Sequence, residues 1–348
     1  MSERKVFLHV VTYGEPEFLP FVLQSLRRQV DFELDGARLE FQLTHNGEEG
    51  LSAVREIYGP ALFNAVNLGF CGAHNQGVQR FLDSDCDALL ILNPDLALHP
   101  DAIHSMERAL FSHESVGMVC PLLLRADNRL EPLSPKVVDS TGIEFHASLR
   151  HFDRDSEMLL DSVVRTRSFV AGASGACVMI RRDCVRDLLL QGEKFDTDLF
   201  CVFPELQEGY EKRAPLFDEA FFAYREDAEL SLRARRLGWK ILFEPEAIGY
   251  HVRRVTPHRR AKLSSDINRH GVRNRFFLQI LHWSLWRDRA TLLPGVLVRN
   301  LIVVLAVLIV ERSSLRALKE VGILWRRAWE RRALLKVRER DSNFTFVQ

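Results

Sequence analysis

The segment Leu89–Asp95, with the sequence LLILNPD, constrains the fold of this chain more than any other segment. Four consecutive aliphatic residues are typical of a strand that is buried on both faces, as in the centre of a parallel sheet. The strand has to end at Asn93-Pro94, because proline lacks the N–H that a sheet ladder needs and favours an extended residue before it. Asp95 is therefore predicted at the carboxyl edge of a central strand, where open α/β sheets bind ligands.

A carboxylate at this edge suits a hard divalent cation that bridges the phosphates of a nucleotide. Asn93, Pro94 and Asp95 also fit an ordinary turn after a core strand. The segment alone leaves both interpretations open.

Strand-like and helix-like segments alternate in the first part of the chain. Lys5–Thr12, Leu39–Thr44 and Ala61–Val66 have strand patterns, and Glu17–Gln29 carries apolar residues at helical spacing. A βαβαβ order predicts a doubly wound, mostly parallel sheet. The Asn- and Gly-rich stretch at 67–77 is expected to be a loop whose backbone amides approach an anion before a helix begins, although such residues also mark ordinary turns.

Acidic residues gather again where a later helix is predicted to start. Glu226, Asp227 and Glu229 precede or begin the helix that continues over Leu230–Leu237. The helix dipole favours acids in a first turn, so they have a purely structural explanation. However, the aromatic segment Phe217–Tyr224 could form a partly dry pocket in which a carboxylate acts as a general base.

A short strand carrying His251 follows, and a basic loop comes directly after it. A single histidine is more often structural than a ligand. The loop begins with Arg253 and Arg254, whose guanidinium groups could grip a diphosphate.

The C-terminal part of the chain is basic and partly apolar. The apolar run Leu301–Val310 is ten residues long, against roughly 20 for a helix that crosses a bilayer. Trp325 and Trp329 lie on the apolar side of a predicted helix over 315–331, as in a monotopic membrane anchor. The basic residues expected on its remaining surface are Arg316, Lys319, Arg326, Arg327 and Arg331. A dimer-forming helix, or one packed on the body, is the alternative.

Composition sets the wider limits. With 348 residues the chain is long enough for one large α/β domain and an appendage, which we place at 1–260 and 261–348. Six cysteines without a CxxC pair and an N-terminus without a signal-peptide pattern favour a cytoplasmic protein with reduced thiols. The formal net charge is zero, and we expect no nucleic acid partner.

Seven motifs in order carry a resemblance to a known family. They are VVTYGEP, HNG, NLGFCGAHNQG, LLILNPD, DSTGIEF, GASGACVMIRR and FDEAFFAYREDAELSLRARRLGW, and His251 follows them. The set resembles the inverting family 2 glycosyltransferases with a GT-A fold, and is most similar to bacterial rhamnosyltransferase-like enzymes that extend lipid-linked glycans. The resemblance runs from about residue 5 to 255 and implies a GT-A type, mostly parallel sheet, here with a C-terminal helical, membrane-associating appendage.

The resemblance also implies roles for single residues. Asp227, in a Glu-Asp pair with Glu226, would be the catalytic base, and Asp95 would bind a divalent metal (Mg²⁺ or Mn²⁺) with His251 as a further ligand. The donor would be contacted by Thr12, Glu15, Asn46, Asn67, Gly69, Asn75, Asn93 and Asp95. The sugar or acceptor pocket would be bordered by Ser174, Gly175 and Ala176.

The chain departs from the family pattern at two places. His45 stands before Asn46 where relatives often have an Asp that reads the base, which makes uridine or thymidine recognition less secure. A long segment, Leu190–Pro215, separates the RR segment from FDE, and we interpret it as an insertion on the acceptor side.

The function implied is inverting transfer of a sugar, with rhamnose as one candidate, from a nucleoside-diphosphate donor to a glycan or lipid-linked acceptor. The enzyme would be attached peripherally to the cytoplasmic face of the membrane and could form a homo-oligomer. Two other classes stay open: a non-catalytic nucleotide-sugar-binding or membrane scaffold protein, and a nucleotidyltransferase.

Overall fold

A computed structural model of the chain describes residues 3–34, 36–146, 150–190, 197–208, 214–253, 265–283, 293–309, 311–341 and 344–346. Its strands are β1 Val6–Tyr13, β2 Leu39–Asn46, β3 Leu62–Asn64, β4 Ala88–Leu92, β5 Leu96–Leu98, β6 Val116–Arg125, β7 Val138–Ser140, β8 Ile143–Phe145, β9 His151–Asp153, β10 Ser168–Val170, β11 Cys177–Arg181 and β12 Lys240–His251. Its helices are α1 Leu19–Leu26, α2 Leu51–Ile57, α3 Gly69–Asp83, α4 Ala102–Leu110, α5 Arg182–Leu188, α6 Thr197–Val202, α7 Glu205–Glu208, α8 Glu226–Arg236, α9 Ser265–His282, α10 Leu293–Ile309, α11 Leu315–Ile323 and α12 Trp325–Arg338. Short 3₁₀ turns are η1 Leu160–Ser162, η2 Glu219–Phe221 and η5 Arg312–Ser314.

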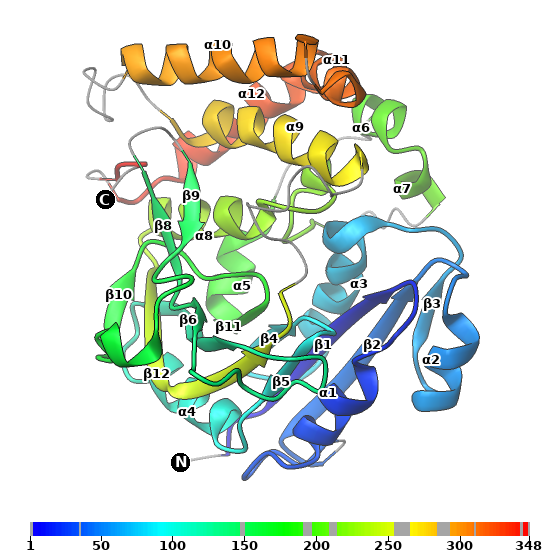
Figure 1. Ribbon diagram of the computed structural model, residues 1–348, viewed down its shortest axis with the longest axis vertical. Helices are drawn as coiled ribbons and strands as arrows, with labels where there is room; N and C mark the ends of the chain where they lie inside the picture. The colour runs from blue at the N-terminus through cyan, green and yellow to red at the C-terminus, as the bar shows by residue number, and fades with distance from the viewer. Residues whose placement is uncertain are drawn as a thin grey trace.

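The central sheet has the strand order β10-β12-β6-β11-β4-β1-β2-β3 (Figure 1). Strands β4, β1, β2 and β3 are parallel, as are β6 and β12, whereas β11 lies antiparallel between β4 and β6. The predicted mostly parallel sheet is therefore confirmed. The strand order reverses at β1, so the carboxyl ends of β1 and β4 meet at a position where such sheets bind ligands.

Alternate side chains of the central strands pack against helices on opposite faces of the sheet. Phe7 and Leu89 belong to the core that includes residues of α3, α5 and α8. Leu8 and Leu90 belong to the core that includes residues of α1 and α4. This period of two is that of a β-strand, and it confirms the prediction that β4 is buried on both faces.

The stretch at 67–77 is mostly helical, so the prediction of a loop there is wrong. Helix α3 begins at Gly69, and its glycines serve close packing. A Cβ atom at Gly77 would lie 2.2 Å from the ring of His9 in β1, and one at Gly72 would lie 3.1 Å from Leu206. Glycine is needed here because the helix approaches its neighbours closely, a reason that the sequence pattern does not separate from turn formation.

Helices α9 to α12 lie together above α8 in Figure 1, at the end of the molecule away from α1 and β5. The prediction that Arg327 and Arg331 lie on the exposed basic surface of an amphipathic helix is wrong. Both are buried, and they bind the Asp218 carboxylate at 2.6 and 3.3 Å. The Trp325 and Trp329 side chains are instead 49% and 45% exposed. Helical periodicity could not reveal this arrangement, because the buried partner lies far away in the sequence.

Residues 344–346 return to the main core. Phe344 and Phe346 are buried, and the Phe346 ring centroid lies 5.3 Å from that of Phe145. Because the predicted domain boundary at residue 260 lies outside the described residues, it stays a prediction. The C-terminal residues nevertheless complete the core of the first part of the chain.

Candidate active site

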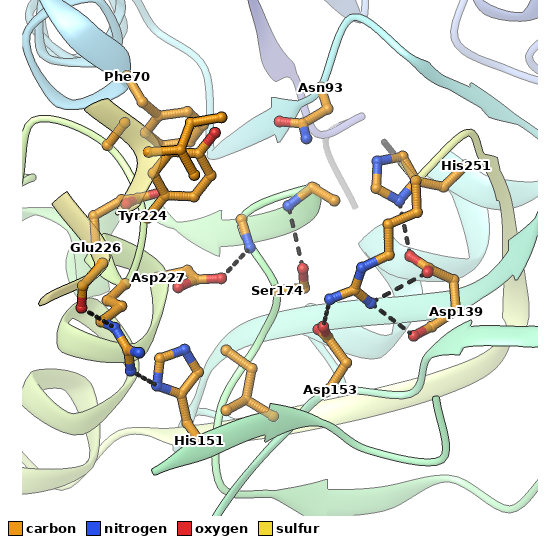
Figure 2. Close-up of a pocket in the computed structure, with 18 of the residues that line it drawn as sticks. Phe70, Asn93, Asp139, His151, Asp153, Ser174, Tyr224, Glu226, Asp227 and His251 are labelled. Carbon is orange, nitrogen blue, oxygen red and sulfur yellow. Dashed lines mark hydrogen bonds and ion pairs between the residues drawn. The ribbon is translucent and has the colours of Figure 1, made fainter. Parts of the chain in front are cut away.

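A cavity of about 630 Å³ opens where β4, β7 and β12 end and α8 begins. It brings together many of the residues predicted from sequence: Asn93, Asp95, Ser174, Gly175, Ala176, Glu226, Asp227, His251 and Arg253. Figure 2 shows that the cavity has two walls, with His251 and Asp139 on one side and Asp227 and Glu226 on the other. We call them the histidine wall and the base wall.

The histidine wall is built around His251, at the end of β12. Its Nδ1 lies 2.8 Å from Oδ2 of Asp139 in β7, and its Nε2 lies 3.3 Å from Oδ1 of Asp95, which follows β4. Burial alone would lower the pKa of His251, but the hydrogen bonds and charges of the two acids outweigh it and raise its pKa to about 10. The imidazole is therefore fixed between two carboxylates.

Arginine side chains complete the histidine wall. Asp139 also binds Arg125 at 2.8 Å and Arg253 at 3.2 Å. Burial opposes ionisation of Asp139, but the hydrogen bond from His251 and the neighbouring positive charges lower its pKa. Arg253 also binds Asp153 in β9, whose pKa is raised by burial even beside this arginine.

The predicted diphosphate grip is therefore only partly described. Arg253 lines the cavity, but its guanidinium contacts Asp139 and Asp153 rather than pointing unbound into the open space. Arg254 lies outside the described residues.

The base wall is formed by the first residues of α8. Asp227 accepts hydrogen bonds from the backbone N–H of Gly175 at 3.1 Å and of Ala228 at 2.7 Å. Burial raises the pKa of Asp227, and the N–H of Gly175 opposes this shift. A carboxylate with a raised pKa, oriented by a backbone amide and facing a cavity, is suited to accept a proton.

Glu226 lies beside Asp227 but differs from it in its contacts. Its side chain is buried, and Oε2 has no hydrogen-bond partner among the described residues. Burial, and then the charge of Asp227, raise its pKa to about 8. Burial and the neighbouring carboxylate therefore favour the protonated form of Glu226.

Glu229 belongs to another site altogether. Its carboxylate binds Arg233 at 2.7 Å and lies 3.4 Å from Nε2 of His282. Burial opposes ionisation, but these partners lower the pKa of Glu229 to about 2. Glu229 is thus a charged member of a buried ion pair, on a different side of α8 from Asp227.

Several residues predicted to contact the donor do not line this cavity. They are Thr12, Glu15, Asn46, Asn67, Gly69 and Asn75. Asn75 is buried and binds residues 216–219: its Nδ2 donates to the Phe217 carbonyl and its Oδ1 accepts from the N–H groups of Leu216 and Phe217. Its amide therefore holds the segment before α8 rather than a nucleotide.

The presence of His45, where an Asp was expected from the resemblance, also has a structural explanation. Its Nε2 lies 2.9 Å from the Glu49 carbonyl, which can only accept, so this nitrogen carries the proton. Nδ1 then accepts from the Thr12 hydroxyl at 2.9 Å. Both side chains are buried and hydrogen-bonded to each other, so neither is placed to read a base.

The remaining predicted donor residues join the loops around α3. Asn46 donates from Nδ2 to the Gly69 carbonyl at 3.1 Å, and Asn67 accepts from the Gly69 N–H at 2.9 Å. Gly69 has a φ of 71°, and a Cβ there would lie 2.6 Å from the Phe222 carbonyl oxygen. These residues fix the start of α3 against the segment that leads to the base wall.

A divalent metal fits the histidine wall in part. Oδ1 of Asp95 is buried and forms an ion pair with Nε2 of His251 at 3.3 Å, and a metal bound there would take the place of the Nε2 proton. Two ligand atoms about 2.1 Å from one cation and at right angles to each other lie about 3 Å apart, so the pair could share a metal. Within the described ranges no group of three His, Cys, Asp or Glu side chains is arranged around one point. Substrate phosphates and water would therefore supply the other ligands, as they commonly do for Mg²⁺.

Sequence reasoning missed Asp139, His151 and Asp153. Asp139 stands in the quoted motif DSTGIEF, which was the available signal, but nothing local assigns it to His251. His151 and Asp153 come from β9, whose hairpin with β8 brings them to the cavity. His151 Nδ1 accepts a hydrogen bond from Arg225 at 3.3 Å, and burial lowers its pKa well below the usual value.

Comparisons with known proteins agree with this architecture. The sequence model of the family described as glycosyltransferase like family 2 matches residues 43–271, about two thirds of the chain. No curated protein matches the chain.

Two solved structures illustrate the structural similarity. A crystal structure of GalNAc-T7 with UDP, GalNAc and Mn²⁺ is similar with a TM-score of 0.55 and 12% identity, over 82% of this chain and 49% of that one. The mannosyltransferase PcManGT from Pyrobaculum calidifontis in complex with GDP-Man and Mn²⁺ gives a TM-score of 0.48 and 14% identity, over 97% and 80% of the two chains. The similarity to GalNAc-T7 supports the predicted GT-A type fold, and this chain spans about half the length of that protein.

Proposed function

The chain belongs to the glycosyltransferase like family 2, and on that premise we propose that it transfers a sugar from a nucleoside-diphosphate donor to an acceptor hydroxyl. The observation that carries the proposal is the pairing of two walls in one cavity that Asp95 also lines, with His251 on one side and Asp227 on the other (Figure 2). The departing diphosphate would lie at the histidine wall. The acceptor hydroxyl would lie at the base wall.

In the proposed reaction Asp227 removes the proton from the acceptor hydroxyl as its oxygen attacks the anomeric carbon. The bond from that carbon to the diphosphate breaks in the same displacement, so the configuration inverts and no covalent enzyme intermediate forms. The N–H of Gly175 orients the Asp227 carboxylate. The raised pKa of Asp227 brings its basicity closer to that needed near neutral pH.

At the histidine wall, Asp95 and His251 would hold the divalent metal. When bound there, the metal supplies Lewis-acid neutralisation of the charge that develops on the leaving diphosphate. Asp139 keeps Nδ1 of His251 engaged, so that Nε2 faces Asp95. Such a carboxylate behind a histidine ligand orients the ring and raises its basicity.

We propose candidates for both substrates, the transferred sugar and the acceptor. The segment Ser174–Ala176, between the walls, would border the transferred sugar, and the sequence resemblance makes rhamnose the first sugar to test. For the acceptor we propose a lipid-linked glycan, because the C-terminal helices expose an apolar surface.

The test is a donor panel. The full-length chain is incubated with nucleoside-diphosphate sugars of different bases and Mn²⁺, and release of nucleoside diphosphate is measured with and without acceptor extracts. We expect release from one donor class, lost in Asp227→Asn. Pyrophosphate release from a nucleoside triphosphate would instead identify a nucleotidyltransferase, and donor binding without release would identify a binding protein.

The apolar surface lies mainly on α10. Its exposed residues are Leu297, Val298, Leu301, Ile302, Leu305, Leu308 and Ile309. Trp325 and Trp329 of α12 are also half exposed, and the neighbouring Arg326 side chain is 83% exposed. Apolar and indole groups bordered by cations fit a bilayer interface with anionic lipids.

The length of the helices limits how this surface can meet a membrane. Among the described residues, none of the helices combines the length and the apolar character that a bilayer-spanning helix requires. The helices Leu293–Ile309 and Arg312–Ile323, which are bent by 109° relative to each other, could together span a bilayer as judged by their length and composition alone. We propose that α10 lies in the interface on the cytoplasmic face.

Vesicle flotation tests this localisation. We expect Leu301→Asp/Leu305→Asp to lose most binding to vesicles containing phosphatidylglycerol, because two charges would enter the apolar layer. Val164, which is 76% exposed and lies between η1 and β10, provides the matched control Val164→Asp. Equal flotation of the double variant and the wild type would contradict the proposal.

A further inference from the structure

The segment that leads into the base wall has an unusual backbone. Phe222, Tyr224 and Arg225 have φ values of 60°, 70° and 71°, and Glu226 and Asp227 follow directly. An L-residue in this region places its Cβ close to the following carbonyl, so three such residues within four positions are unfavourable. Surrounding contacts have to hold this conformation.

One side chain of α9 supplies many of these contacts. The Nδ2 atom of Asn274 lies 2.8 Å from the Phe221 carbonyl oxygen, 2.9 Å from that of Ala223 and 2.6 Å from that of Tyr224. Three carbonyls therefore converge on one amide, which is fully buried. The backbone with these positive φ values brings the three carbonyl oxygens to one point.

The orientation of the Asn274 amide is itself fixed by the residue before it. Arg273 donates from Nε to Asn274 Oδ1 at 3.0 Å, and an arginine can only donate, so Nδ2 must face the carbonyls. Arg273 also donates to the Phe221 carbonyl at 2.8 Å and to Glu320 of α11 at 3.0 Å. The segment is thus held from the C-terminal helices.

Aromatic stacking holds the same segment from a second direction. The Phe222 ring stacks on Phe203, with centroids 4.9 Å apart, and on His270 of α9, with centroids 5.0 Å apart. Phe203 belongs to the inserted segment Leu190–Pro215. These contacts place the ring but do not reach the carbonyls that Asn274 binds.

We propose that Asn274 is a positioning residue, which sets the location of Asp227 by holding the backbone of residues 221–225. The proposal rests on the proposed function, because it takes Asp227 as the base. It assigns part of the catalytic geometry to the C-terminal helical region. A displacement of about 1 Å at a reacting group can cost on the order of 100-fold in rate.

The test compares two amide deletions on the same helix in the full-length chain. Asn274→Ala should lower kcat about 10- to 100-fold, with KM for the donor changed less than about threefold. Hydrogen exchange should become faster in the peptide covering 221–229 and stay unchanged in β1 and β4. Asn274→Ser, which keeps one short donor, serves if the alanine variant does not fold.

Gln279→Ala is the matched control. Gln279 is also buried in α9, but its amide bonds only with Asn300 of α10 among the hydrogen bonds described. We expect normal kcat and normal exchange at 221–229, even if Tm falls. Similar losses of kcat in both variants, in proportion to lost Tm, would overturn the proposal, as would unchanged kcat and exchange in Asn274→Ala.

Asp227→Asn separates this proposal from the assignment of the base. If Asp227→Asn abolishes turnover while Asn274→Ala and Asn274→Ser retain it, only the positioning role fails. If Asp227→Asn retains turnover, the base assignment fails, and the positioning of Asp227 with it.

Discussion

The two walls of the cavity both carry acids, but they differ in what surrounds those acids. On the histidine wall, Asp139 contacts three cationic side chains: Arg125, His251 and Arg253. On the base wall, Asp227 is held by backbone N–H groups, and its neighbour Glu226 is buried without a hydrogen bond at Oε2.

This difference determines which wall can exchange protons near neutral pH. Cations lower the pKa of Asp139, so it stays charged. Burial raises the pKa of Asp227 and Glu226, so these groups can take up or hold a proton. One cavity thereby separates charge neutralisation from proton transfer, and four predictions test the separation.

The largest effect is expected on the base wall. Asp227→Asn keeps the shape of the side chain but cannot accept a proton, so kcat should fall by a factor on the order of 10² to 10⁴. Donor affinity, measured by calorimetry with Mn²⁺, should change little. A near-normal kcat in Asp227→Asn together with inactive Glu226→Gln would move the base to Glu226.

On the histidine wall the expected loss is in binding. Asp95→Ala removes the carboxylate that faces Nε2 of His251, so Mn²⁺-dependent donor affinity should fall by about 100-fold or more. Calorimetry with and without Mn²⁺ measures it, and circular dichroism checks the fold. Unchanged metal-dependent affinity would show that Asp95 is not a ligand.

The residue behind His251 should have a smaller effect. Asp139→Asn weakens the hydrogen bond to Nδ1, and we expect roughly 10- to 100-fold weaker metal affinity. Asp153→Asn is the control, because Asp153 is bound to Arg253 but has no described bond to His251. Equal losses in the two variants would show that the wall acts through its total charge rather than through the orientation of His251.

The smallest effect concerns stability and pH. The native state keeps the Glu226 proton up to a pKa of about 8, whereas the unfolded state loses it near the ordinary glutamate pKa of 4.5. The native state therefore binds more protons between these values, so Glu226 lowers stability progressively as pH rises from about 4.5 to 8.

Glu226→Gln should remove this penalty. Its Tm should be close to that of the wild type at pH 5 and higher by on the order of 5 °C at pH 9. Scanning calorimetry at both pH values measures the difference. A constant Tm difference across the range would mean that Glu226 is not protonated in the native state.

The comparison of the walls also shows what the sequence could predict. Asp95 and Asp227 were found because each follows a local signal, the end of an aliphatic strand and the start of a helix. Asp139 and Asp153 were not assigned, because they reach the cavity through pairings of β7 with β6 and of β9 with β8. The antiparallel position of β11 between β4 and β6 was also not predicted, because its sequence does not determine whether it runs parallel or antiparallel to them.

Two predictions failed for the same physical reason. The glycines at 67–77 and the arginines at 327 and 331 can each serve several structural roles. The role that each one takes is set by a partner residue far away in the sequence. Gly77 packs on His9, and both arginines bind Asp218. A local sequence pattern gives the residue type but does not indicate which distant residue it contacts.

The burial of Phe346 against Phe145 has a consequence for the order of events during biosynthesis. A ribosome makes residue 145 long before residue 346, so the pocket around Phe145 has to wait for most of the chain to be translated. Domains generally fold as units, N-terminal first, as they emerge. Here we expect the sheet to assemble early but to keep an exposed apolar patch around Phe145 until residues 344–346 arrive.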